Sequence, residues 1–330
     1  MHVALYSQRD DERAAIAQFK AAHPDLEIDV YDQPLTEDLR GTLKGIDAVV
    51  VQQIAPMGEE TYAEMERQGV KALATRSAGT DMYRLDLLKK HGVKMVNVPS
   101  YSPESIAEFA FVTALTVSRK AAPFIERRAE NHDFSWEPSM MSRTIRSKTI
   151  GIAGTGRIGR ETARFFAGIG CKVLGYDLYP SDAGRELLTY VDSLDDLLRQ
   201  SDIVSFHMPA TAENHHILDA RAIALMPEGA IVVNTGRGAL IDTEALLDAV
   251  DSGHLAGAAL DVYEFEDSLV QKNQPEVDSL MQRILDNPRV LYTPHIAFYT
   301  EQAVAALIAQ SIEGAIEAAQ GGHPVGEIEL

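Results

Sequence analysis

The segment of residues 149–159 constrains the fold of this chain more than any other part of the sequence. It reads TIGIAGTGRIG, a short apolar run followed by glycines at positions 154, 156 and 159, and a helix-forming stretch continues to Gly168. Between a strand and a helix, such glycines permit a sharp turn, let a ligand approach the backbone and let the helix pack closely on the strand. The unpaired N–H groups at the helix start attract a phosphate. The segment therefore predicts a βαβ unit that binds a dinucleotide.

An acidic residue at the end of the next apolar run indicates which dinucleotide this is. Residues 172–177 read KVLGYD, and Asp177 is followed by Leu178 rather than by an arginine. A carboxylate at this place accepts hydrogen bonds from ribose hydroxyls and repels a 2′-phosphate, so NAD is favoured over NADP. Arg157, within the glycine segment, adds a positive charge near the pyrophosphate. The residues predicted to bind the cofactor in this region are Gly154, Thr155, Gly156, Arg157, Ile158, Gly159, Tyr176 and Asp177.

Short apolar runs alternate with amphipathic, helix-length stretches through nearly the whole chain. This alternation predicts an α/β fold with parallel sheets covered by helices on both faces. Since 330 residues exceed what one hydrophobic core organises, we expect two Rossmann-like, doubly wound domains. The dinucleotide motif lies in the middle, so residues 101–299 form the NAD-binding domain, and residues 1–100 plus 300–330 form a discontinuous outer domain. The predicted strands include residues 48–51, 93–98, 150–153, 172–176, 203–206, 230–234 and 290–292.

A long apolar helix is expected where the two domains join. Ser102 can cap this helix, Pro103 suits its first position, and the pattern continues past Arg119 towards Glu130. So long and apolar a helix is unusual on a surface, which predicts that it contributes to a homodimer interface. The alternative is packing inside one domain. The residues on which this choice depends are Phe109, Phe111, Val112 and Leu115.

Charge and composition argue against several classes of partner. The formal net charge is −19, whereas nucleic acids and anionic membranes bind clustered Lys and Arg. No apolar run approaches the roughly 18 residues that a membrane span requires. The N-terminal residues MHVALYSQRDDER lack the pattern of a signal peptide and are expected to form a first strand. With the single Cys171, typical of a reducing compartment, these features predict a cytoplasmic protein, and no metal site is expected.

Two further segments follow predicted strands, at the edge where open α/β sheets bind ligands. In VNTGRGALID, Arg237 stands between two glycines, so its side chain projects from a tight turn with little shielding. Its planar guanidinium can bind a carboxylate or a carbonyl oxygen. In VLYTPHIAFY, His295 follows a strand and a proline. Histidine exchanges protons near neutral pH, and reduction of a 2-oxo acid requires a proton donor beside the hydride donor.

A carboxylate next to this histidine would raise its pKa and fix its orientation. Several acids follow the strand that ends in LDVYEFED, at residues 260–267, and can serve as that partner. Taken singly, each histidine that follows a predicted strand is more typical of a structural or surface position. Only the combination of these features makes His295 stand out. The histidines that follow predicted strands are His207, His215, His216 and His295.

The combination of motifs resembles the D-isomer-specific 2-hydroxyacid dehydrogenase family, over nearly the whole chain. The motifs are GTGRIG, SFHMPAT, VNTGRGALID, LDVYEFE and TPHIAFYTE, in the family's order. An acid rather than a proline follows LDVYEFE, and AFYT follows the histidine, which favours the lactate branch. The resemblance implies NADH-dependent reduction of pyruvate or a related 2-oxo acid to the D-2-hydroxy acid. It also implies a homodimer.

Position by position, the resemblance implies a catalytic set. Arg237 would bind and polarise the oxo acid, His295 would be the acid/base, and Glu266 would support the histidine, with Glu264 as the competing candidate. Asp261 would line the cofactor side of the site. Further positions that match cofactor contacts are His207, Pro209 and Thr235.

The outer domain would bind the substrate. The loop of residues 77–81 resembles one whose backbone N–H groups hold the substrate carboxylate, chiefly at Ala78 and Gly79. Val51 stands where a side chain is expected to set substrate size, and a valine there leaves room for larger acids. The residues expected to contact substrate are Ser77, Ala78, Gly79, Tyr101, Arg237, His295, Phe298, Tyr299 and Val51.

Three alternatives remain open at this point. A sibling enzyme could prefer 2-oxoisocaproate, phenylpyruvate or hydroxypyruvate, or could make D-lactate as part of antibiotic resistance. The same fold also serves as an NAD-sensing corepressor scaffold, although this sequence lacks appended tails for binding peptides. Formate dehydrogenase is disfavoured, because its chemistry uses a histidine–glutamine pair and no proton donor.

Overall fold

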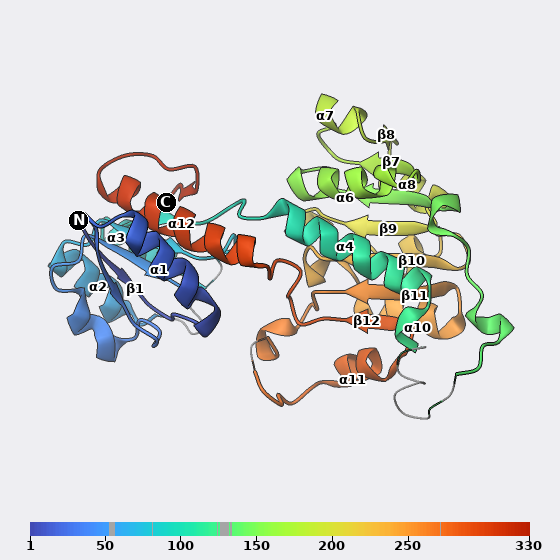
Figure 1. Cartoon of the computed structure of the whole chain (residues 1–330), viewed down its shortest axis with the longest axis horizontal. Helices are drawn as coiled ribbons and strands as arrows, with labels where there is room; N and C mark the ends of the chain where they lie inside the picture. The colour runs from blue at the N-terminus through green and yellow to red at the C-terminus, as the bar shows by residue number, and fades with distance from the viewer. Residues whose placement is uncertain (53–56, 81, 124, 126–131, 133, 271) are drawn as a thin grey trace. The chain divides into compact units, whose positions relative to one another are not determined.

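The computed structural model describes residues 1–52, 57–80, 82–123, 125, 132, 134–270 and 272–330. The chain divides into two compact units (Figure 1). Unit 1 comprises Met1–Ser102 and Tyr299–Leu330, and unit 2 comprises Pro103–Phe298. Each unit is an open sheet with helices on both of its faces, as the alternating pattern predicts.

Unit 1 holds a six-stranded sheet with the order β13-β5-β4-β3-β1-β2. All neighbouring strands are parallel except β13, which runs antiparallel to β5. Helices α1 and α12 pack on one face of this sheet, and α2 and α3 pack on the other. The strands are β1 (His2–Leu5), β2 (Glu27–Val30), β3 (Ala48–Val51), β4 (Ala72–Thr75), β5 (Lys94–Val96) and β13 (Glu327–Ile328). The helices are α1 (Arg13–Ala22), α2 (Glu59–Gln68), α3 (Leu85–Lys90) and α12 (Glu301–Ala319).

Unit 2 holds a seven-stranded, all-parallel sheet with the order β12-β11-β10-β9-β6-β7-β8. The strand order reverses between β6 and β9, where open α/β sheets bind ligands. Helices α4 and α6 cover one face, and α8 to α11 cover the other. The strands are β6 (Thr149–Ala153), β7 (Lys172–Tyr176), β8 (Thr189–Tyr190), β9 (Ile203–Phe206), β10 (Ala230–Asn234), β11 (Leu255–Leu260) and β12 (Val290–Tyr292). The helices are α4 (Pro103–Ser118), α6 (Arg157–Gly168), α7 (Asp182–Arg185), α8 (Leu194–Gln200), α9 (Ala220–Ile223), α10 (Thr243–Ser252) and α11 (Ser279–Asp286).

Local chemistry explains where these elements begin. The four residues of β3 and of β9 are all buried, as expected for strands covered on both faces. Helix α12 begins where the Thr300 side chain accepts a hydrogen bond from the Ala303 N–H, and α10 begins where Asp242 does the same for Ala245. Such caps satisfy donors that a helix start leaves unpaired.

The long helix differs from the prediction. Helix α4 ends at Ser118 and is followed by a turn at residues 119–120, where Lys120 adopts a left-handed conformation with φ of 53°; residues 121–123 and 125 are helical again. The predicted continuation at residues 124 and 126–131 lies outside the described residues. Phe111 is partly buried and packs on Phe165 and Phe166 of α6, at the margin of the unit 2 core, whereas Val112 is exposed.

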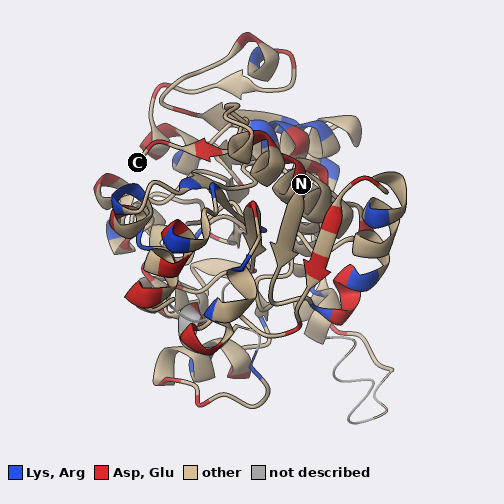
Figure 2. Cartoon of the chain, turned by 90° about the vertical axis from the view of Figure 1, so that its left-hand side faces the viewer, with Lys and Arg blue, Asp and Glu red and all other residues tan. Residues whose placement is uncertain are grey.

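The charged residues are spread over the helices. In Figure 2 basic and acidic segments are interspersed, and no continuous basic face is visible in this view of the described residues. Within the described part of the chain, no helix is both long enough and apolar enough to cross a lipid bilayer. The described residues also contain no group of three or more His, Cys, Asp or Glu that could hold a metal ion.

Candidate active site

The glycine turn after β6 is tightly packed against backbone atoms on one side and has free space on the other. Gly154 has a φ of 90°, and a Cβ on it would lie 2.7 Å from the Met208 backbone nitrogen. A Cβ on Gly159 would lie 2.0 Å from the Gly154 carbonyl oxygen, so α6 could not pack here with any other residue. A Cβ on Gly156 would meet no described atom within 4 Å. The N-terminus of α6, which begins at Arg157, therefore has room for a phosphate in front of it.

The acid predicted to bind ribose is held against this turn. Asp177 Oδ2 accepts hydrogen bonds from the Thr155 N–H at 2.6 Å and from the Thr155 hydroxyl at 3.1 Å, and Oδ1 accepts one from the Tyr179 N–H at 2.9 Å. The buried Thr155 hydroxyl also bonds with the Tyr190 hydroxyl at 2.7 Å. Asp177 itself is half-buried. It is thus fixed at the end of β7 and retains acceptor capacity for a ligand hydroxyl.

Two buried polar atoms after β9 and β10 lack a partner among the described residues. His207 Nε2 bonds with the Ser205 hydroxyl at 2.8 Å, but its Nδ1 has no partner, and the Thr235 hydroxyl has none either. Burial lowers the pKa of His207 to about 3, so the imidazole is neutral. Buried polar atoms rarely go unsatisfied, so both atoms are candidate contacts for a polar ligand. Pro209, two residues after His207, is exposed.

A histidine–carboxylate pair follows β11 and β12. His295 Nδ1 lies 2.8 Å from Glu266 Oε1, and Glu266 Oε2 accepts a hydrogen bond from the Tyr263 N–H at 2.9 Å. Burial by itself would lower the pKa of His295. The hydrogen bond and charge of Glu266, with the charge of Asp261, outweigh burial and raise this pKa, while Arg237 acts to lower it. The arrangement favours an imidazolium that can donate its Nε2 proton.

Asp261 holds the histidine loop in place. Its carbonyl oxygen accepts the His295 N–H at 2.8 Å. Its carboxylate accepts the Thr293 hydroxyl at 2.6 Å and the N–H groups of Ile296 and Ala297 at 2.9 and 2.8 Å. These bonds keep His295 at a φ of 57°, a left-handed conformation that histidine adopts only at a cost. The buried Asp261 side chain thus bonds with residues 293, 296 and 297 and fixes the loop that carries His295.

The arginine turn is equally well supported. A Cβ on Gly238 would lie 2.2 Å from the Tyr263 carbonyl carbon, so the turn packs directly on the residues before Glu266. The buried Asn234 side chain accepts the Gly236 N–H at 3.0 Å and donates to the Arg237 carbonyl oxygen at 2.9 Å. The Arg237 side chain is exposed, and its Nη1 donates to the Gly236 carbonyl oxygen at 2.8 Å. The positive charge of Arg237 acts to lower the pKa of His295, so the two groups lie near enough to interact electrostatically.

Glu264, the competing candidate, has another partner. Its Oε2 lies 2.9 Å from His216 Nε2, and its Oε1 accepts the Thr243 N–H at the start of α10. The His216 ring stacks on His215 with ring centroids 3.9 Å apart. Glu266, and not Glu264, therefore contacts His295. The sequence alone does not single out Asn234 or the His216–Glu264 pair, although Asn234 stands inside the VNTGRG motif.

In unit 1, the loop after β4 presents backbone N–H groups. The Ser77 hydroxyl donates to the Gly79 carbonyl oxygen at 2.7 Å, and the Asn97 side chain donates to the Ala78 carbonyl oxygen at 2.7 Å. The N–H groups of Ala78 and Gly79 have no backbone acceptor among the described residues. Two such donors side by side can bind a carboxylate. Asp81, the last residue of the predicted loop, lies outside the described residues.

One predicted pocket residue is corrected by the structure. Val51 is 0 % exposed, and its side chain packs on the face of the unit 1 sheet that α2 and α3 cover. It therefore belongs to the core and does not support a roomy substrate pocket. Tyr101 and Phe298 are half-buried, whereas Tyr299 is exposed and its hydroxyl bonds with the Asp11 carboxylate.

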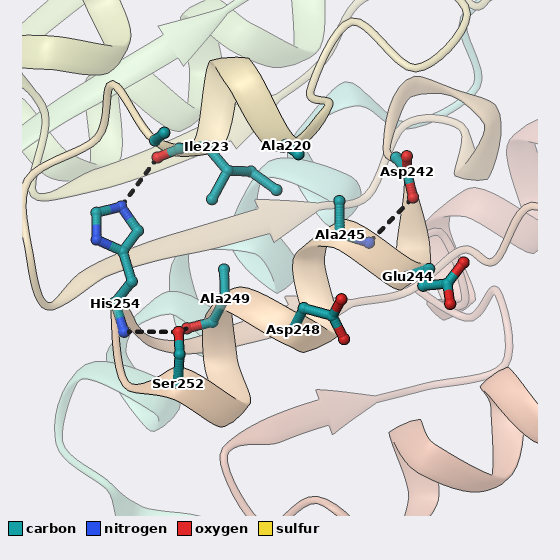
Figure 3. A pocket seen from close by; sticks show the side chains of 10 residues that line it. Ala220, Ile223, Asp242, Glu244, Ala245, Asp248, Ala249, Ser252 and His254 are labelled. Carbon is teal, nitrogen blue, oxygen red and sulfur yellow. Dashed lines mark hydrogen bonds between the residues drawn. The ribbon is translucent and has the colours of Figure 1, made fainter.

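A separate hollow of about 510 Å³ lies between α9 and α10 (Figure 3). Its polar residues already serve other elements: Asp242 caps α10, Asp248 pairs with Arg283, and His254 bonds with the Ile223 carbonyl oxygen at 3.0 Å. None of the predicted site residues lines this hollow. It is not part of the candidate active site.

Comparison with known proteins identifies the relatives of this chain. Residues 111–297 match the model of the D-isomer specific 2-hydroxyacid dehydrogenase, NAD binding domain. The chain is 44 % identical to a D-lactate dehydrogenase of Treponema pallidum, over 100 % of both chains. It is 35 % identical to a D-2-hydroxyacid dehydrogenase (NAD(+)) of Clostridioides difficile, over 99 % of this chain and 100 % of that protein. The crystal structure of a D-lactate dehydrogenase from Treponema pallidum aligns over 100 % of both chains with 44 % identity and a TM-score of 0.95.

Proposed function

This chain belongs to the D-isomer-specific 2-hydroxyacid dehydrogenase family, and on that premise we propose that it acts as a D-lactate dehydrogenase. It reduces pyruvate, or a closely related 2-oxo acid, to the D-2-hydroxy acid with NADH. The observation that carries this proposal is the 2.8 Å contact of His295 with Glu266, beside a guanidinium whose charge acts on the same imidazole. A proton donor and an anion-binding group thus serve one small substrate.

The residues divide the chemistry among them. Arg237 binds the carboxylate of the oxo acid and polarises the carbonyl group. The imidazolium of His295 donates the Nε2 proton to the carbonyl oxygen, and Glu266 stabilises the imidazolium and holds its Nδ1. When bound, NADH would supply the hydride for C2. The products are NAD⁺ and the hydroxy acid, and solvent returns a proton to His295. Within unit 1, the N–H groups of Ala78 and Gly79 can bind a carboxylate.

NAD is the cofactor, and unit 2 contains the groups that fit it. The open side of Gly156 and the start of α6 suit a pyrophosphate. Asp177 accepts hydroxyls and disfavours the phosphate of NADP. The unpartnered His207 Nδ1 and Thr235 hydroxyl fit polar groups of the nicotinamide half. We therefore assign NAD binding to unit 2 and part of substrate binding to unit 1.

A substrate panel tests the proposed function. Oxidation of NADH is followed with pyruvate, phenylpyruvate, 2-oxoisocaproate, hydroxypyruvate and oxaloacetate, and the product is analysed on a chiral column. We expect the highest kcat/KM with pyruvate, D-lactate as the product and a lower rate with NADPH. A preference for 2-oxoisocaproate or hydroxypyruvate would identify a sibling enzyme. NADH binding without turnover of any acid would instead support the corepressor-like scaffold.

We also propose that the protein is a cytoplasmic homodimer that dimerises through unit 2. Phe134, Trp136 and Met141, which follow α4 in the sequence, are 76, 85 and 77 % exposed. Side chains of this kind are costly to leave in water and are enriched in interfaces between subunits. A hollow of about 660 Å³ lies beside this segment, between the end of α4 and residues 137–140. A second copy of the chain would cover both features.

Light scattering coupled to size-exclusion chromatography tests the dimer. We expect twice the monomer mass at micromolar concentration. The variant Trp136→Ser should shift the equilibrium towards monomer, because it removes the largest exposed apolar side chain of the segment. Leu178→Ser, which removes another exposed apolar side chain elsewhere in unit 2, is the control and should remain dimeric. A monomeric wild-type protein would contradict the proposal.

A further inference from the structure

An ion pair lies completely inside unit 1, directly before the loop that offers its N–H groups to a carboxylate. Arg76 follows β4 and precedes Ser77, and its side chain is 0 % exposed. Its Nε donates to Glu12 Oε1 at 3.0 Å and its Nη2 to Glu12 Oε2 at 3.3 Å. Glu12 is 1 % exposed. Burying two charges in this way costs desolvation energy. Apolar side chains of similar volume often stabilise a fold as much as a buried ion pair does.

The remaining donors of Arg76 join three strand ends. Nη1 donates to the Tyr6 carbonyl oxygen at 3.0 Å, and Nη2 donates to the Ser7 carbonyl oxygen at 2.7 Å, at the end of β1. The Arg76 N–H donates to the Val51 carbonyl oxygen at 2.9 Å, at the end of β3. Ser7 adopts a φ of 56°, which a serine rarely holds without such support. Because the guanidinium is completely buried and its Nε, Nη1 and Nη2 all donate within the protein, it fixes the start of the loop and cannot bind substrate directly.

The network continues from Glu12 towards the surface. The Arg9 N–H donates to Glu12 Oε2 at 2.9 Å, and the Arg9 guanidinium forms two hydrogen bonds of 3.0 Å with the Asp11 carboxylate. Asp11 bonds with the Tyr299 hydroxyl. Although partial burial would raise the pKa of Asp11, the bonds from Arg9 and Tyr299 lower it, so the carboxylate stays ionised. The network thus ends at a residue that the family resemblance assigns to substrate contact.

We propose that Glu12, Arg76, Arg9 and Asp11 form a positioning network that fixes the Ala78–Gly79 carboxylate loop and Tyr299 in one arrangement for the oxo acid. The proposal rests on the proposed function, because it assigns these residues to the substrate side of that reaction. None of them touches the substrate. The four charges, two positive and two negative, also cancel, so the network orients groups rather than attracting an anion by its net charge.

The variant Asp11→Asn tests the network at its partly exposed end, where folding is least at risk. The asparagine keeps the shape of the side chain but replaces the carboxylate, whose negative charge orients Arg9 and whose oxygen accepts a hydrogen bond from the Tyr299 hydroxyl. We expect KM for pyruvate to rise about fivefold, the effect of losing one hydrogen bond, with KM for NADH unchanged. Asp10→Asn is the matched control. It removes the same charge one residue away, where Asp10 pairs with the exposed Arg13, and should change neither constant.

A double variant separates the loop from Tyr299. If Asp11 acts on the loop through Arg9, Glu12 and Arg76, then Asp11→Asn still raises KM for pyruvate in a Tyr299→Phe background. No further effect in that background would mean that Asp11 acts on Tyr299 alone, which would overturn the network. Equal KM values for the Asp11→Asn and Asp10→Asn proteins would do the same. A wild-type protein that reduces no oxo acid would refute the proposed function itself, a distinguishable result.

Glu12→Gln tests the centre of the network. It leaves Arg76 buried beside a neutral partner, so we expect a lower unfolding midpoint and, in the folded protein, a larger rise in KM for pyruvate than Asp11→Asn gives. KM for NADH should again stay constant, because a general loss of structure would affect both ligands. A Glu12→Gln protein with lowered stability and wild-type KM for pyruvate would restrict the pair to a structural role. Should this variant not fold, Asp11→Asn decides the question.

Discussion

Replacement of Arg237 by lysine is expected to lower kcat/KM for pyruvate roughly 100- to 1000-fold, the usual effect of removing a group that stabilises a developing oxyanion. Lysine keeps the positive charge but lacks the planar fork that binds a carboxylate and a carbonyl oxygen together. The turn itself should be unchanged, because Asn234 fixes its backbone and Gly238 sets its packing. The Arg237 side chain donates a hydrogen bond to the neighbouring Gly236 carbonyl oxygen, within the same turn. Losing this hydrogen bond should therefore leave the free energy of unfolding nearly unaffected.

Steady-state kinetics and thermal unfolding together check this expectation. Arg283→Lys is a suitable control, since Arg283 lies on α11 of the same unit and pairs with two surface aspartates. It should keep wild-type kinetics. An Arg237→Lys enzyme with wild-type turnover and KM would show that another group binds the oxo acid. A large fall in the unfolding midpoint would instead indicate that Arg237 supports the fold.

Much of the fold could be predicted from the sequence, because buried parallel strands leave a simple signal. The apolar runs at residues 172–176, 203–206 and 230–234 coincide with β7, β9 and β10. The end of α4 could not be predicted, since nothing in the local sequence requires the left-handed conformation of Lys120. Phe111 shows the same limit: apolar residues on a helix indicate burial, but not whether the partner is another helix of the same unit or a second chain.

The site could be predicted only in part. The glycine segment carries its own physical meaning, and the structure gives each of its outer glycines a steric reason. In contrast, the choice between Glu264 and Glu266 depends on family resemblance, because two acids two positions apart give no local signal of which one meets a histidine 29 or more residues away. Val51 is the last residue of a strand, close to the edge at which such sheets bind ligands, so its sequence position suggests a pocket residue. Its alternation with Val50, which packs on the opposite face, places it in the core.

Glu266→Gln is expected to move the pH range of pyruvate reduction downwards. The reaction in this direction requires the imidazolium form of His295, so its rate falls as the pH rises through the pKa of that histidine. Burial lowers this pKa, and the hydrogen bond and charge of Glu266, together with the charge of Asp261, more than compensate. A neutral amide removes the charge, so the pKa falls and the decline in rate begins at a lower pH. Well above the pKa, the protonated fraction falls about tenfold for each further pH increment of one.

The same change alters stability in a direction that can be worked out independently. Because folding raises the pKa of His295, the pair stabilises the folded protein below the pKa of an unfolded histidine, and this contribution is lost as the pH rises through the folded-state pKa. Glu266→Gln should therefore lower the unfolding midpoint more at acidic than at alkaline pH. Glu264→Gln, two positions away and paired with His216, is the control and should not move the pH profile of reduction. An unchanged profile in the Glu266→Gln enzyme would mean that the proton comes from a group other than the His295–Glu266 pair.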